Sequence, residues 1–169
     1  MNNVTQVLSE EHQIILRVIN AAFKECEDIE QGKAIELSFF QKTIDFIRNY
    51  ADKFHHAKEE EILFIAMLES ADQMHCNPIP VMLHEHAESR ELVQGMEEAI
   101  SENNIEKLID NTRAYGMLLQ QHIYKEDNVL YPMAEQGLTN EQKVVIKQKY
   151  QEANSKLEAV LDIEALVFV

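Results

Sequence analysis

The stretch FHHAKEEEILF, residues 54–64, places two adjacent histidines just before three adjacent glutamates in a run of helix-favouring residues. Side chains at alternating steps of three and four share one face of an α-helix. The face through His55 is apolar apart from one histidine and one glutamate, and it reads Phe40, Ile44, Ile47, Ala51, His55, Glu59, Ile62, Ala66. The face through His56 is polar and carries Glu60. The pattern predicts that His55 and Glu59 face the core and that His56 and Glu60 face water.

In the other helical stretches of the first 135 residues, a histidine likewise interrupts an otherwise apolar face. Each contributes one inward histidine, and the last adds a glutamate one turn later; these residues are His12, His86, His122 and Glu126. His84 instead lies on a polar face. The two HxxxE pairs belong to a weak internal repeat, in which HHAKEEEILF is answered by HIYKEDNVLY. We therefore expect four histidines and two glutamates to meet at one level of a helical bundle.

The composition predicts an all-α fold. The chain has 169 residues, of which 46% are hydrophobic, and only four glycines and three prolines; this favours one domain, 1–169, made of long helices. The helices are expected at about 9–29, 33–69, 79–100, 104–134 and 140–161. Ser9 is the predicted cap of the first helix, and Thr139 with Gln142 forms a capping box for the last.

Short links between long amphipathic helices favour an antiparallel up-and-down four-helix bundle. We expect this bundle at about residues 5–135, with an additional C-terminal helix, about 140–161, against its outside or end. The apolar tail ALVFV, residues 165–169, is expected either to dock on the bundle or to form a homodimer contact, and the sequence leaves the oligomeric state open.

Charge and motifs argue against several functions. The chain has 30 acidic and 15 basic residues and a net charge of -15, which disfavours nucleic acid and anionic lipid as partners. It has no apolar run long enough to span a membrane and no signal-peptide pattern, so a cytoplasmic location is predicted. Cys26 and Cys76 form no CxxC motif, and no nucleotide-binding or serine-hydrolase motif occurs.

The inward histidines and glutamates indicate a metal site. A single inward histidine is more often a hydrogen-bonded core residue, and a metal-free bundle is the simplest alternative. Four histidines and two carboxylates, however, are costly to bury without partners. Two His/Glu pairs at i, i+4 suit two metal ions about 3.5 to 4 Å apart. Imidazole and carboxylate without thiolate favour iron, then manganese or zinc.

A few more residues are candidates for the surroundings of this site. His56, His84 and Glu60 are expected to support ligands at most. Tyr115 is expected to be a core aromatic residue whose hydroxyl is satisfied, with a hydrogen bond near the site as the alternative. Asp127 falls one position off the inward path of its helix.

Four stretches together resemble the hemerythrin-like, or HHE cation-binding, domain: EEHQIIL, FHHAKEEEILF, VMLHEHAESRELV and LLQQHIYKEDNVLYPMA. The resemblance covers about residues 5–135. It implies a four-helix bundle with two Fe ions in an oxo- or hydroxo-bridged di-iron centre. The implied metal ligands are His12, His55, Glu59, His86, His122 and Glu126, with both glutamates bridging. Asp127 is the reserve ligand, because members of the family differ in the spacing after the fourth-helix histidine.

One departure from the oxygen-carrying hemerythrins bears on function. Those proteins have a fifth histidine one turn from the third-helix ligand, where this chain has Met82 and Arg90. The chain is thus closer to the H-HxxxE-H-HxxxE subgroup, whose members are linked to nitric oxide or peroxide handling, stress response, iron-sulfur cluster repair, and iron or oxygen sensing. We expect a di-iron protein that binds or reacts with O2, nitric oxide or peroxide, with an iron or oxygen sensor without turnover as the alternative. Whether it is an enzyme stays open.

Overall fold

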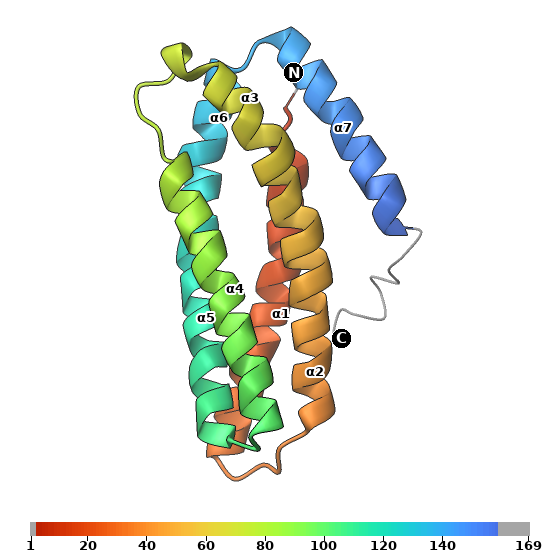
Figure 1. Cartoon of the computed structure of the whole chain (residues 1–169), viewed down its shortest axis with the longest axis vertical. Helices are drawn as coiled ribbons and strands as arrows, with labels where there is room; N and C mark the ends of the chain where they lie inside the picture. The colour runs from red at the N-terminus through yellow and green to blue at the C-terminus, as the bar shows by residue number, and fades with distance from the viewer. Residues whose placement is uncertain (1–2, 159–169) are drawn as a thin grey trace.

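Four helical arms run side by side along the long axis of the molecule, and neighbouring arms in the sequence run in opposite directions (Figure 1). The computed structural model describes residues 3–158, which include no strand. The first arm is α1 (Gln6–Glu30) and the third is α4 (Ile79–Ser101). The predicted all-α bundle with an additional C-terminal helix is confirmed.

The second and fourth arms each combine α-helical and π-helical segments, and the π-helical segments lie near the middle of the bundle. The second passes through α2 (Leu37–Phe46), the π-helical segments η1 (Ile47–His56) and η2 (Glu59–Leu63), and α3 (Phe64–Glu69). A short 3-10 turn, η3 (Ala71–Gln73), follows in the link to α4. The fourth arm consists of α5 (Ile105–Lys125), the π-helical η4 (Glu126–Leu130) and α6 (Tyr131–Gly137). Both arms thus contain wide turns beside their HxxxE pairs.

Two predicted helix beginnings need correction, and one predicted capping box is confirmed. The first helix begins at Gln6, so Ser9 lies inside it, and the Ser9 hydroxyl donates to Asp127 instead of capping. The second arm begins at Leu37, later than the predicted residue 33. The capping box is confirmed, since the backbone N–H of Gln142 donates to Thr139 Oγ1 and that of Thr139 donates to Gln142 Oε1.

The core consists of two apolar clusters with a polar layer between them. One cluster includes Ile15, Ala51 and Leu119. The other includes Leu8 and Leu63 with their neighbours. On every arm the inward histidine falls between residues of the two clusters, so the histidines form a belt across the middle of the bundle. Burial of the apolar side chains on both sides stabilises the fold and keeps bulk water from this belt.

The π turns shift the buried face of each compound arm by one residue. The straight path predicted Ile62 and Ala66 inside, but both are half-buried, and Leu63 and Met67 are the buried residues. In the fourth arm Val129 is 49% exposed and Leu130 is buried in its place. An i→i+5 turn contains one residue more than an α-turn, so residues beyond it lie on a different face.

The additional helix α7 (Asn140–Glu158) packs against η2 on the outside of the second arm (Figure 1). The remainder of the predicted last helix, to residue 161, and the tail ALVFV lie outside the described residues. Within residues 3–158, no helix combines the length and the apolar character needed to cross a membrane.

Candidate metal centre

Each of the four arms contributes a histidine to the polar layer. His12 comes from α1, His55 from η1, His86 from α4 and His122 from α5, and each is at most 1% exposed. The Nε2 atoms of His86 and His122 lie 3.0 Å apart, and the rings of His12 and His55 have centroids 4.6 Å apart. The structure therefore brings together the four histidines that the sequence placed inside.

Two fully buried glutamates lie among these histidines. Glu126 places Oε2 3.2 Å from His12 Nε2 and Oε1 3.1 Å from His122 Nε2. Glu59 places Oε2 3.4 Å from His86 Nε2 and 3.8 Å from His55 Nε2. Each carboxylate thus approaches histidines from two different sides of the layer, which is the position that a carboxylate bridging two metal ions requires.

A carboxylate outside the layer holds the Nδ1 atom of each of these histidines. An ionised carboxylate only accepts hydrogen bonds, so the contact places a proton on Nδ1 and turns Nε2 inward. This arrangement of carboxylate, histidine and metal fixes the orientation of imidazole ligands in metalloproteins. The four pairs are His12 with Asp127 at 3.0 Å, His55 with Glu11 at 2.8 Å, His86 with Glu60 at 2.7 Å and His122 with Glu85 at 2.8 Å.

Cationic side chains in turn hold three of these outer carboxylates. Lys58 Nζ donates to Glu11, and Lys125 Nζ donates to Glu85. Arg90 donates to Glu60 at 2.8 Å. The outer carboxylates therefore remain ionised next to the histidines, as the lowered pKa values of Glu60 and Glu85 also indicate.

The carboxylates of the layer favour positive charge on the histidines. Although burial opposes the charged form, the contacts with Asp127 and Glu126 raise the pKa of His12 to about 10. In the same way, burial is outweighed by Glu59 and Glu60, which raise the pKa of His86 to about 9. The layer thus stabilises cations, whether protons or metal ions, that bind at the inward nitrogen atoms.

Several inward atoms fit metal ligation because they lack a hydrogen-bond partner within the described part of the chain. They are His55 Nε2, His56 Nε2, Glu59 Oε2 and both carboxylate oxygens of Glu126. A buried polar atom without a partner costs about 1–3 kcal/mol, a cost that a bound metal ion removes.

The inward atoms form two groups, each with all its ligand atoms within 4.8 Å of one another. Glu59 belongs to both groups, so the two candidate positions are adjacent and share a ligand. The first group is His12, His55, Glu59 and Glu126, and the second is His56, Glu59, His86 and His122. All six residues that the sequence predicted as ligands occur in these groups. The donors are imidazole and carboxylate, which suit iron, manganese or zinc.

The expectation that His56 faces water is wrong. His56 is 2% exposed, and its ring stacks on that of His86 at a centroid distance of 3.8 Å. Burial, followed by the nearby charge of His86, lowers the pKa of His56 well below its ordinary value. Both adjacent histidines are buried and lie at the end of the π-helical segment η1, where the straight α-helical path used for the prediction no longer holds.

The other supporting candidates differ in their positions. Glu60 supports His86, while His84 is exposed on the regular helix α4 and does not reach the layer. Asp127, the reserve ligand, is in neither group and holds His12. Tyr115 is a buried core residue as expected, but its hydroxyl has no hydrogen-bond partner among residues 3–158, which contradicts the satisfied hydroxyl we predicted.

Sequence reasoning missed Tyr131, which lies directly at the first group. Its hydroxyl donates to Glu59 Oε1 at 2.6 Å and lies 3.2 Å from His12 Nε2. Its ring is 2% exposed and stacks on that of His12. Tyr131 directly follows η4, so only a helical path shifted by one residue after Glu126 would have placed it inside.

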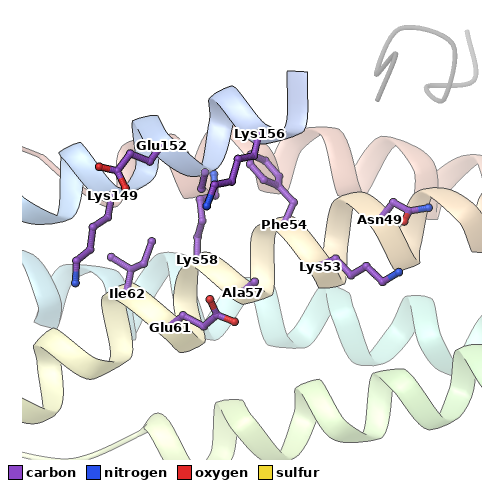
Figure 2. A pocket seen from close by; sticks show the side chains of 11 residues that line it. Asn49, Lys53, Phe54, Ala57, Lys58, Glu61, Ile62, Lys149, Glu152 and Lys156 are labelled. Carbon is purple, nitrogen blue, oxygen red and sulfur yellow. The ribbon is translucent and has the colours of Figure 1, made fainter. Parts of the chain in front are cut away.

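A cavity of about 580 Å³ lies on the outer side of the second arm, between that arm and α7. Figure 2 shows Lys58 and Ile62 reaching from the arm toward α7, and Lys149 reaching back. Lys58 is the connection to the metal centre, because its Nζ contacts Glu11 on the inner side and Asn154 of α7 at 3.3 Å. The cavity itself is not lined by the inward histidines.

A helical bundle whose central layer holds two adjacent groups of histidine and carboxylate side chains is typical of metal-binding bundle proteins. A comparison with family models matches residues 3–134 to the hemerythrin HHE cation binding domain. The chain therefore belongs to the hemerythrin HHE cation-binding family, and metal binding follows from this membership together with the two ligand groups. Neither the curated proteins nor the solved structures include a match.

Proposed function

We propose that this protein holds two iron ions and binds or reacts with a small oxidant, either O2, nitric oxide or peroxide. The proposed metal ligands are His12, His55, Glu59, His86, His122 and Glu126. The observation that carries the proposal is the pair of buried ligand groups that share Glu59, with inward atoms that have no hydrogen-bond partner among residues 3–158. When bound, a pair of iron ions supplies the redox chemistry and the coordination positions that a diatomic molecule or peroxide requires.

The surrounding residues prepare the centre for this role. The outer carboxylates orient the imidazoles before metal arrives, so little reorganisation is needed on binding. Tyr131 donates its hydroxyl hydrogen to Glu59, and the hydroxyl lies beside His12. If this O–H turned away from Glu59, it would donate a hydrogen bond or a proton to a small ligand in this part of the layer. The apolar clusters on both sides limit the access of water.

The first experiment is to measure the metal content of the protein as purified and after anaerobic loading with Fe(II). About two irons per chain, followed by stopped-flow reaction of the reduced protein with O2, nitric oxide or peroxide, would support the proposal. Failure to retain iron after anaerobic loading, or retention of zinc alone, would refute it. Two bound irons that react with none of the three oxidants would restrict the function to metal binding.

Alanine variants of two histidines test the ligand assignment. His55→Ala and His122→Ala should each lose most of the iron, because each change removes an imidazole from a different ligand group. The helical content in circular dichroism should stay close to that of the parent protein. His84→Ala is the matched control, since His84 is exposed and should leave the iron content unchanged. Retention of all the iron by both histidine variants would contradict the assignment.

An iron or oxygen sensor is the second candidate function, and one contact chain favours it. His55 contacts Glu11, Glu11 contacts Lys58, and Lys58 contacts Asn154 on α7. A change at the metal ligand thus has a direct route to an outer helix. Limited proteolysis discriminates the two functions: a sensor should show new cleavage in or around α7 after metal removal, and a protein that only reacts with the oxidant should not.

A further inference from the structure

His56 occupies a position that core packing alone explains poorly. It is 2% exposed, and neither ring nitrogen has a hydrogen-bond partner in the described part of the chain. The nearest acceptor, Asp52 Oδ1, lies 3.5 Å from Nδ1, and Asp52 itself receives a hydrogen bond from Arg90 at 2.8 Å. A neutral imidazole always carries one N–H, so burial of this ring without partners costs free energy.

The surroundings of His56 are those of a ligand. Its ring stacks on that of His86 and meets that of His122 edge-on, with centroids 5.9 Å apart. Ligand atoms of His56, Glu59, His86 and His122 all lie within 4.8 Å of one another. Asp52 stands near the outer nitrogen of His56, as a carboxylate does for each of the other four histidines of the layer. His56 thus shares the inward position of the predicted ligands, and a carboxylate lies near its outer nitrogen without a hydrogen bond to it.

We propose that His56, in the π-helical segment η1, is a fifth histidine ligand of the centre. One metal ion is then held by His56, His86 and His122 and the other by His12 and His55, with Glu59 and Glu126 between them. This inference rests on the proposed two-metal function. It makes the two metal ions chemically distinct, with three imidazoles on one and two on the other.

The test compares His56→Phe with the parent protein by competitive titration with Fe(II) under anaerobic conditions. Phenylalanine retains an aromatic ring that can stack on His86 but has no nitrogen donor. We expect one of the two irons to bind more weakly by more than the ~10–100-fold that loss of an outer hydrogen-bond partner causes. Mössbauer spectra of the diferrous protein should show two unequal iron sites in the parent and a changed signal for one of them in the variant.

A second variant provides chemical rescue. His56 lines a cavity of about 240 Å³ together with Asp52, Ser89 and Arg90, so a free imidazole molecule has room next to the position of the ring. In His56→Gly, added imidazole should restore the binding of the second iron. An added N-methylated amide of similar size should not restore the binding, because it offers no imidazole nitrogen. His84→Gly is the matched control for the loss of a histidine from an exposed position.

The outcomes separate this inference from the proposed function. Suppose that the parent binds two irons and that His56→Phe has the same iron affinity and the same Mössbauer signals. This result would overturn the role of His56 and leave the two-metal function intact. Absence of iron binding in the parent would overturn both. Should His56→Gly prove unfolded in circular dichroism, the titration and spectra of His56→Phe decide. Weakened binding of one iron with rescue by imidazole supports the inference.

Discussion

At the scale of single residues, the orientation of each imidazole depends on a carboxylate behind it. His122 is held by Glu85, whose other oxygen is held by Lys125. Lys125 is 40% exposed, so it stays hydrated when its partner is removed. Because the lysine side of this ion pair is in water, loss of the pair should change the free energy of unfolding only modestly, whereas loss of the contact with His122 acts on metal binding.

We predict that Glu85→Gln weakens metal binding by roughly 10–100-fold, because the amide no longer fixes the proton on His122 Nδ1. The free energy of unfolding of the metal-free variant should change by less than about 1 kcal/mol. Competitive metal titration and chemical denaturation measure the two quantities. Glu88→Gln, an exposed position on the same helix, is the control. Equal metal affinity in both variants would contradict the role given to Glu85.

At the scale of helices, the π turns decide which residues reach the interior. Each lies beside an HxxxE pair, and one extra residue in the turn changes the face that follows. In the second arm, η1 ends with the two buried histidines His55 and His56. In the fourth arm, η4 places Tyr131 so that its hydroxyl reaches Glu59 and His12. Single π turns within α-helices occur frequently at functional sites, where they alter the direction of a few side chains.

We predict that deletion of Asn128, an exposed residue of η4, converts this turn to α-helix and leaves the bundle folded, because the residues on both sides keep their buried faces. Metal affinity should fall, since Glu126 and Tyr131 change their relative positions. Deletion of the exposed Gln120, in the regular helix α5, should instead rotate all later residues by about 100° and prevent stable folding. Circular dichroism, thermal unfolding and metal titration compare the two deletions. Equal stability in both would contradict the assignment of an extra residue to η4.

At the scale of the whole molecule, the polar layer makes stability depend on metal and on pH. Metal that binds only the folded state adds about 4 kcal/mol when its free concentration is about 1,000 times its Kd. In the metal-free protein, protons on His12 and His86 balance the buried carboxylates instead. The two apolar clusters then pack against a layer whose charge balance changes with pH.

We predict that the metal-free protein loses stability as the pH rises from about 7 to 10. Burial opposes protonation of both histidines, but contacts with Asp127 and Glu126 raise the pKa of His12 to about 10, and Glu59 and Glu60 raise that of His86 to about 9. A raised pKa contributes stability that is complete below the ordinary value near 6.5 and lost as the pH passes the folded value. Chemical denaturation should show a decrease on the order of 6 kcal/mol from the two histidines together. The metal-loaded protein, whose imidazoles are already deprotonated, should show a smaller decrease, and equal decreases would contradict the prediction.

Much of the fold and part of the centre follow from local sequence. Apolar spacing and helix-end residues predicted the helical arms and the additional helix α7. The same spacing selected the six proposed ligands, because His12 and His86 lie on regular helices, where a period of 3.6 residues holds. His122 and Glu126 were found because they lie at or before the beginning of η4. His55 and Glu59 were found although η1 begins before them, because the predicted path through Ala51 still reaches the buried side there.

The sequence by itself determined the all-α bundle and its belt of histidine and glutamate, because helical periodicity and the cost of burying polar groups are both properties of local pattern. Only the tertiary structure decided that His56 and Tyr131 enter the layer, that Asp127 stands behind His12, and which carboxylate holds each imidazole. These features depend on π turns and on contacts between different arms. The spacing of residues along one helix predicts neither, since a π turn is stabilised only by contacts that form when the arms pack together.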